Sequence, residues 1–222
     1  EKDLHVLLDG VKEGRHTYAN LMKYIKLAAS FNFGEVMSVI IASVILPFLP
    51  ETPIQLLVEG LLYDFGQLTL PLDNVDEEYL KKPKKFDVKS LKNFMLFMGP
   101  LSSWCDLIVF ALDWLSYDIH EPAIFQTIWF IYSIVSNLVG MHVIRTAKIP
   151  FKESHASKAV YFSSISICII AMIIPFTFIG RAIGLTALAA KDFLVIIGVP
   201  ILYCFVAVIA KKIYIKKYGE WI

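Results

Sequence analysis

Cysteine is scarce in this sequence and does not form the pattern of a disulfide framework. The three cysteines, Cys105, Cys168 and Cys204, all lie inside apolar runs, which is typical of small buried side chains. The sequence also has no glycine-rich phosphate loop, no nucleophile elbow, no HExxH motif and no pair of histidines at metal-site spacing. We therefore predict no catalytic and no cofactor-binding residue in this chain.

Charge is scarce as well. Only 18% of the residues are charged and the net charge is +1, while 57% are hydrophobic and the mean hydropathy is +0.62. Soluble proteins average about 45–50% apolar residues. The lysines form short clusters between apolar runs and no single basic face, which argues against a nucleic-acid partner. The apolar runs approach the ~20 residues that cross a ~30 Å hydrocarbon core, so we expect the lipid bilayer to be a partner.

The apolar runs predict an all-α, polytopic membrane protein with a bundle of six transmembrane helices. We place the helices at about 30–46, 54–70, 94–115, 124–144, 159–179 and 193–209. The first is expected to continue a helix that begins in water at Gly14, after a short strand or helix start that ends at Asp9-Gly10. Pro175 is expected to weaken the end of the fifth span, and residues 117–122 are expected to form a short polar turn.

Lysine and arginine set the expected orientation. All but two of the 21, Arg181 and Lys191, fall in the N-terminal stretch, in the loops after spans two and four, or in the C-terminal tail. The positive-inside rule then places both termini in the cytoplasm and requires an even number of crossings. We expect a multi-pass protein of the cell (plasma) membrane. The first thirty residues show no signal peptide, and without an initiator methionine the chain is expected to be a piece of a longer protein.

Spans one and two carry polar groups where a membrane helix is expected to have none. These are Asn32 and Glu35 in the first span and Glu59, Asp64 and Gln67 in the second. A charge at mid-bilayer costs about 2.5–3.5 kcal/mol even on the lenient insertion scale, and neither span contains a lysine or arginine. A bound cation or a proton is then the natural partner, and hard oxygen ligands favour magnesium or calcium.

Helical spacing sorts these groups into faces. Asn32 and Glu35 are three residues apart and share a face, and so do Asp64 and Gln67. Asp64, a short side chain near the middle of its span, is the strongest candidate ligand. Glu59 is rotated away from Asp64 and is expected to point inward only if the helix is irregular at the following glycine.

Other interpretations stay open at this point. Asn137 in span four is either a further metal ligand or half of an interhelical hydrogen bond. Asn32 and Gln67 are alternatively structural hydrogen-bonding groups, with Glu35 and Glu59 near the membrane interfaces. Besides part of a pump, the pattern also fits a passive channel, an ion-coupled carrier complete in itself, or a structural subunit without an ion site.

Several motifs resemble a known family. They are NFGEV at 32–36, LPFLP at 46–50, LLYD at 61–64, PLDNVD at 71–76, GPLSS at 99–103 and HVIRT at 142–146. Together they resemble the magnesium-transporting P-type ATPases over nearly the whole chain. The resemblance implies the C-terminal membrane part of such a pump, membrane helices five to ten. Residues 1–14 would end the cytoplasmic phosphorylation domain, 15–29 would form a stalk helix, and 30–222 would form the transmembrane domain.

The resemblance also implies a function. The whole protein would be an ATP-driven pump that imports Mg²⁺, and ATP-Mg would bind to cytoplasmic domains outside this sequence. The expected partners are the divalent cation, the lipid bilayer, and the N-terminal helices and cytoplasmic domains of the same pump, so the chain alone is not catalytic. By position, Asn32, Glu35 and Asp64 match the cation ligands of membrane helices five and six.

Two positions depart from the magnesium-pump pattern. Glu35 stands where magnesium pumps usually have asparagine and calcium pumps have glutamate. Gly60 stands where both have asparagine, and Glu59 lies beside it. The site is therefore more acidic than the resemblance implies, and calcium or another divalent cation remains the alternative cargo.

Overall fold

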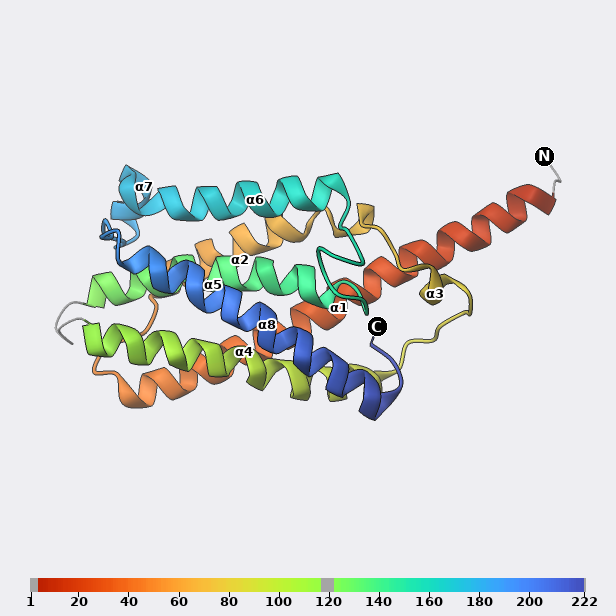
Figure 1. The fold of residues 1–222 in the computed structure, drawn as a ribbon. Coiled ribbons are helices and arrows are strands. Elements are labelled where there is room, and N and C mark those ends of the chain that lie inside the picture. Colours follow the sequence, from red (N-terminus) through yellow and green to blue (C-terminus); the bar gives the residue numbers. More distant parts are fainter. Residues whose placement is uncertain (1–3, 117–121, 222) are drawn as a thin grey trace.

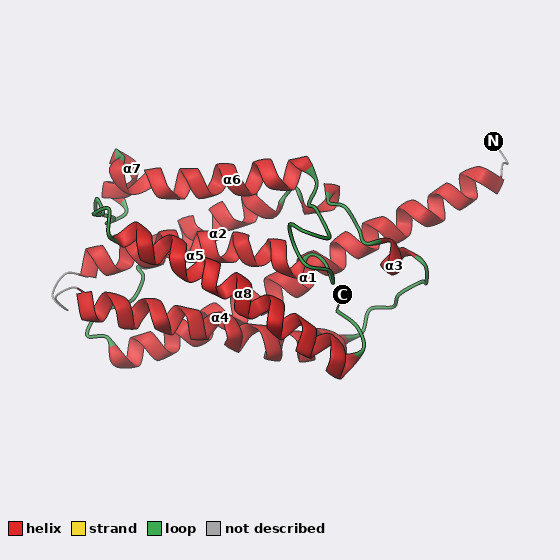
Figure 2. Ribbon diagram, in the orientation of Figure 1, coloured by secondary structure: helices red, strands yellow, loops and turns green. Residues whose placement is uncertain are grey.

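The computed structural model describes residues 4–116 and 122–221. Within them the regular structure is helical (Figure 2) apart from one isolated bridge between Pro150 and Ser154. The polar turn predicted at 117–122 lies almost wholly outside the described residues. The elements are α1 (Leu4–Ile45), α2 (Pro53–Gln67), η1 (Leu70–Leu72), α3 (Glu77–Leu80), α4 (Val88–Ser116), α5 (Pro122–Ile144), α6 (Lys158–Ile173), η2 (Ile174–Phe176), α7 (Phe178–Ala182) and α8 (Asp192–Tyr218).

Five of the described helical segments are long and apolar enough to cross a membrane, namely α1, α4, α5, α6 continued by η2, and α8. This confirms the all-helical, membrane-type fold. The second predicted span is the shorter helix α2, whose 15 residues extend about 22 Å at 1.5 Å per residue. That is less than the ~30 Å of a hydrocarbon core.

Helix α1 is one uninterrupted helix of 42 residues, about 63 Å long. Figure 1 shows its N-terminal half projecting well beyond the bundle. The strand or helix break expected at Asp9-Gly10 was wrong, because Gly10 and Gly14 both lie inside the helix. A glycine costs a helix interior only about 1 kcal/mol relative to alanine, which does not end a helix of this length.

Helix α5 is the centre of the bundle, and 89% of its most apolar 18-residue window is buried inside the protein. It packs against α2, α6 and α8, while α1 packs mainly against α4. A Cβ atom on Gly34 of α1 would lie only 2.8 Å from the Gly99 carbonyl oxygen of α4. Small residues thus bring these two backbones close together, as in many membrane helix pairs.

The helix ends follow local chemistry. Asp87 accepts hydrogen bonds from the backbone N–H groups of Lys89 and Ser90 at 2.9 and 3.2 Å and so caps the start of α4. The weakening expected at Pro175 is also confirmed, since α6 ends at Ile173 and continues as the 3₁₀ turn η2. All three cysteines are free.

Candidate functional site

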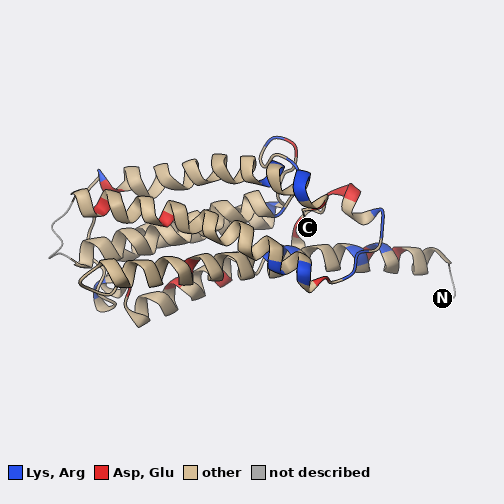
Figure 3. Cartoon of the chain, turned by 90° about the horizontal axis from the view of Figure 1, so that it is seen from below, with Lys and Arg blue, Asp and Glu red and all other residues tan. Residues whose placement is uncertain are grey.

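Three carboxylates from separate segments come together inside the bundle. Glu35 of α1, Glu51 of the loop formed by residues 46–52, and Glu59 of α2 each offer an oxygen within 4.8 Å of the others. Glu51 and Glu59 are only 6% and 3% exposed, and Glu35 is half-buried. We call these three residues the acidic cluster. In Figure 3, Asp and Glu positions appear as short red stretches within helices that are otherwise mostly uncharged.

Glu59 reaches the cluster because α2 is a regular helix. The buried positions of α2 are Gln55, Glu59, Tyr63, Gly66 and Gln67, which recur at the spacing of one helix face. Asp64 lies about 140° away around a helix of 3.6 residues per turn and is exposed. The expectation that Glu59 points inward only if the helix is irregular was therefore wrong.

Glu51 reaches the cluster because the 46–52 loop folds onto the bundle. The Gln126 side chain of α5 donates a 2.9 Å hydrogen bond to the Leu49 carbonyl. Next to Glu51, Thr52 and Gln55 form a reciprocal capping box that starts α2. The sequence placed Glu51 in a proline-rich turn, and its burial was missed. The available signal was a lone carboxylate among apolar and proline residues.

The acidic cluster lacks partners in the protein. Both carboxylate oxygens of Glu51 and the Oε2 atom of Glu59 are buried without a hydrogen bond to any described residue. Across residues 4–116 and 122–221, no salt bridge to Glu35, Glu51 or Glu59 is formed. Buried carboxylates without a partner are costly, so the arrangement calls for a bound cation or protons.

Asp64 and Gln67 lie in a different place. They line a cavity of about 540 Å³ between the N-terminal half of α1 and the end of α2, whose other lining residues are Thr17, Asn20, Leu21, Tyr24, Leu68, Leu70 and Pro71. Gln67 is 2% exposed, and neither its amide oxygen nor its nitrogen has a partner among the described residues. This cavity is thus a second polar region, separate from the acidic cluster.

The remaining predicted site residues are not gathered. Asn32 is exposed on α1, and Asn137 is half-buried on α5, where it forms no hydrogen bond with another described residue. Of the six candidates from the sequence, Glu35 and Glu59 come together in the acidic cluster, where Glu51 joins them, and Asp64 and Gln67 line one separate cavity.

Another buried carboxylate shows how this protein stabilises acids elsewhere. Asp106 of α4 accepts hydrogen bonds from the hydroxyl groups of Ser38 in α1, at 2.5 Å, and Tyr132 in α5, at 3.1 Å. Asp106 thereby joins three helices, with a donor for each carboxylate oxygen. In the acidic cluster, by contrast, Trp129 and Ser133 lie near Glu51 and Glu59, but both oxygens of Glu51 and the Oε2 atom of Glu59 form no hydrogen bond of this quality with a described residue.

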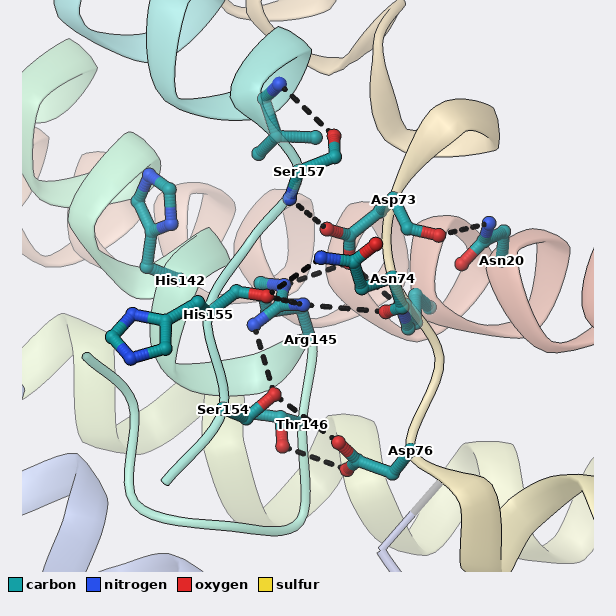
Figure 4. Close-up of polar contacts among 12 residues, drawn as sticks. Asn20, Asp73, Asn74, Asp76, His142, Arg145, Thr146, Ser154, His155 and Ser157 are labelled. Atoms are coloured by element: carbon teal, nitrogen blue, oxygen red, sulfur yellow. Dashed lines mark hydrogen bonds and ion pairs between the residues drawn. The ribbon is translucent and has the colours of Figure 1, made fainter. Parts of the chain in front are cut away.

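A buried ion-pair network lies beyond the C-terminal end of α2, whereas the 46–52 loop precedes the start of α2. Figure 4 shows the network in close-up. The Oδ2 atom of Asp73 accepts from Lys23 Nζ and Arg145 Nε, both at 2.7 Å, and Oδ1 accepts from the Ser157 N–H at 3.1 Å. Burial alone would raise the pKa of Asp73, but the hydrogen bonds and charges of Arg145 and Lys23 outweigh it and hold that pKa below its usual value.

The same network joins two loops to α1. The Asn20 side chain donates to the carbonyls of Pro71 and Asp73, both at 3.0 Å. Asp76 accepts from the hydroxyls of Thr146 and Ser154 at 2.7 and 3.1 Å. The segment after α2 is therefore attached to the N-terminal half of α1, and the loop between α5 and α6 is attached to that segment, as Figure 4 shows.

A bundle of membrane-length helices that encloses carboxylates without partners defines a polytopic helical membrane protein with an internal acidic site. Comparison with known proteins identifies the family. The family model described as "Cation transporting ATPase, C-terminus" matches residues 48–213, which is most of the chain. The chain belongs to the cation-transporting ATPase family.

Individual relatives agree with this assignment. The chain is 43% identical over 224 residues to the magnesium-transporting ATPase, P-type 1, of Salmonella typhimurium LT2, and 39% identical over 222 residues to that of Escherichia coli K12. These alignments cover 100% and 99% of this chain but 25% of each relative. The calcium-transporting ATPase 1 of Bacillus cereus is 30% identical over 109 residues, 47% of this chain and 12% of that protein. The chain thus spans about a quarter of the length of the magnesium-transporting relatives.

Proposed function

We propose that this chain is the C-terminal part of the membrane domain of an ATP-driven pump that imports Mg²⁺ through the cell membrane. The magnesium-transporting relatives, similar over the whole chain, support this proposal. The observation that carries it is the acidic cluster, in which three carboxylates from α1, the 46–52 loop and α2 meet without a cationic side chain. ATP-Mg binding and phosphorylation belong to the rest of the pump, so the chain alone is not catalytic.

In this proposal α2 and the 46–52 loop together form the sixth crossing, and both termini are cytoplasmic. The described ends of the chain lie at one end of the bundle (Figure 1). Figure 3 shows most of the lysine and arginine segments at that same end, in keeping with the positive-inside rule. Residues 1–14 would then end the phosphorylation domain, 15–29 would be the stalk, and 30–222 the transmembrane domain.

The candidate ligands fall into two groups in this proposal. Glu35 and Glu59 lie in the acidic cluster, whereas Asn32 and Asp64 are exposed on the surface of the bundle. Helices of the pump that precede this sequence would cover Asn32 and Asp64 and supply further ligands. Gln67 would contribute from the same cavity as Asp64, and Asn137 would contribute from α5.

The mechanism follows from the shape of α1. This single helix is about 63 Å long and carries Glu35, so a tilt imposed at its N-terminal end moves the Glu35 carboxylate. Phosphorylation and dephosphorylation in the rest of the pump would supply the tilt. Access to Glu35 and its affinity for the cation would change as a result.

The test is Mg²⁺ uptake by the purified full-length protein in lipid vesicles. Uptake should require ATP, and both Glu35→Gln and Asp64→Ala should reduce it by at least tenfold, since each removes a charged ligand. Asp113→Asn is the matched control, because Asp113 is a buried carboxylate of α4 outside the acidic cluster. Uptake without ATP would instead indicate a channel or carrier, and unchanged uptake in Asp64→Ala would remove Asp64 from the site.

Calcium is the second candidate cargo. Three carboxylates suit Ca²⁺, which takes 6–8 oxygen ligands, better than Mg²⁺, which usually keeps several waters and one or two carboxylates. The calcium-transporting relative, similar over about half of the chain, points the same way. Uptake of Ca²⁺ in preference to Mg²⁺ by the same vesicles would establish this alternative.

A further inference from the structure

We infer that Glu51 and Glu59 are ligands of a second binding site for a divalent cation, which we call the station. It shares Glu35 with the transport site and lies on the side of that site nearer the 46–52 loop. The inference rests on the proposed function, because it assigns a step on the path of the pumped ion. Neither Glu51 nor Glu59 matches the cation-binding positions that the family resemblance assigns. The station is therefore an addition to the ligands Asn32, Glu35 and Asp64.

The geometry suits an ion with hard oxygen ligands. The three carboxylates offer oxygens that lie within 4.8 Å of one another. Opposite ligands are about 4.2 Å apart around Mg²⁺, with bonds of 2.0–2.1 Å, and about 4.6–5.2 Å apart around Ca²⁺. Three ligands of one ion cannot all be opposite one another, so a small inward movement or a bridging water would bring the carboxylates into the coordination sphere of either ion.

The state of the oxygens points to a ligand as well. Glu51 is more than nine-tenths buried, both of its carboxylate oxygens lack a partner among the described residues, and it is directed into the cluster. Two other buried carboxylates have partners, since Asp106 has two hydroxyl donors and Asp73 has a lysine and an arginine. Asp113 of α4 has one oxygen without a partner among the described residues, whereas both oxygens of Glu51 lack one. The burial of Glu51 is explained if a cation takes the place of such partners.

The position of Glu51 gives the station its role. Glu35 lies ten residues before the end of α1, about 15 Å along the helix axis. The 46–52 loop begins at that end, away from the ion-pair network of Asp73, and Glu51 is the only member of the cluster on a non-helical segment. An ion that moves between Glu35 and the end of the bundle where the 46–52 loop lies would pass to Glu51. Movement of this loop would open or close the path between the two carboxylates.

The first experiment measures the Mg²⁺ concentration that gives half-maximal uptake by the full-length protein in vesicles. We expect Glu51→Gln and Glu59→Gln each to raise this concentration by about tenfold or more, because each removes one carboxylate ligand from the station. Asp113→Asn should leave it unchanged. If Glu51→Gln has the same concentration dependence as Asp113→Asn, Glu51 is not a ligand and the inference is overturned.

The second experiment detects binding directly. Trp129 lies beside Glu51 and is 1% exposed, so excitation of its indole should sensitise the luminescence of Tb³⁺, an oxygen-seeking ion, bound at the station. The signal should be lost in Trp129→Phe and in Glu51→Gln and kept in Asp113→Asn. A signal that is equal in Glu51→Gln and in the unsubstituted protein would overturn the inference.

The two experiments separate this inference from the proposed function. ATP-dependent Mg²⁺ uptake with no effect of Glu51→Gln in either measurement leaves the pump intact and removes the station. A Tb³⁺ signal that depends on Glu51, in a protein that transports no Mg²⁺, supports the cation site and removes the proposed cargo.

Discussion

Replacement of Asp73 by asparagine should be among the most damaging single changes outside the acidic cluster. Asp73 is 0% exposed and pairs with Lys23 and Arg145, which are 2% and 1% exposed, at 2.7 Å each. Asparagine keeps the size of the side chain but leaves two buried cations without their counter-charge. Removal of one partner of a buried ion pair costs about 3–5 kcal/mol, and we expect Asp73→Asn to fall in this range.

The free energy of unfolding of the full-length protein in detergent micelles, titrated with denaturant, measures this effect. Lys23→Met should cost less than Asp73→Asn, because the pair between Asp73 and Arg145 survives. Glu78→Gln is the control, since Glu78 forms an ion pair with Lys148 that is largely exposed and contributes little. If Asp73→Asn were no more destabilising than Glu78→Gln, the buried network would not hold the loops to α1.

The same carboxylate predicts a pH dependence. The pKa of Asp73 is held below its usual value by Arg145 and Lys23, and an unperturbed aspartate has a pKa of about 3.9. The stabilisation is therefore complete above about pH 4 and is lost as the pH falls through the lower pKa of the folded state. The Asp73→Asn variant should lack this contribution to acid unfolding.

Other substitutions test the packing. Gly34→Ala should destabilise the fold by about 1–3 kcal/mol, because its Cβ atom would press on the α4 backbone. Gly198→Ala is the control, since a Cβ atom there meets nothing within 4 Å. An equal effect of both substitutions on the free energy of unfolding would contradict the close packing. Gly14→Ala should stabilise α1 by about 0.5–1 kcal/mol, seen as a higher unfolding midpoint. Lys211→Met should destabilise the protein by about 1–3 kcal/mol per backbone carbonyl left unpaired, because Lys211 donates to three carbonyls; unfolding titrations measure the loss. Gln126→Ala should free the 46–52 loop, which hydrogen exchange of that loop would detect as faster exchange.

Hydropathy predicts most of this fold, because a membrane-length apolar run leaves few alternatives to a helix. It predicted the position of α5 to within two residues, whereas α4 begins six residues earlier and α8 ends nine residues later than the predicted spans. It placed the end of α2 at residue 70, whereas the helix ends at Gln67 and the 3₁₀ turn η1 follows it. The weakened end of α6 was predicted from Pro175, and the structure shows a 3₁₀ turn there. The continuous start of α1 was not predicted, because Asp9-Gly10 was expected to be a break, although α1 continues through Gly10 and Gly14.

The candidate site was only partly predictable. Glu35 and Glu59 were expected from their charge in apolar surroundings, and the structure brings both into one cluster. Glu51 was missed because its burial depends on how the 46–52 loop folds against α5, a contact between segments that are distant in the sequence. The regular spacing of Gln55, Glu59 and Tyr63 along α2 already indicated that Glu59 points inward with them.

The shortness of α2 has one more consequence. A backbone that crosses a bilayer outside a helix is tolerated only where protein or a water-filled space surrounds it. In the proposed topology the 46–52 loop completes the sixth crossing, and it would satisfy this condition by lying against α5. A helix resists deformation because each bend breaks its hydrogen-bond ladder, whereas a loop can change course by rotating a few bonds. A segment of this bundle that can change its course therefore lies directly beside the acidic cluster.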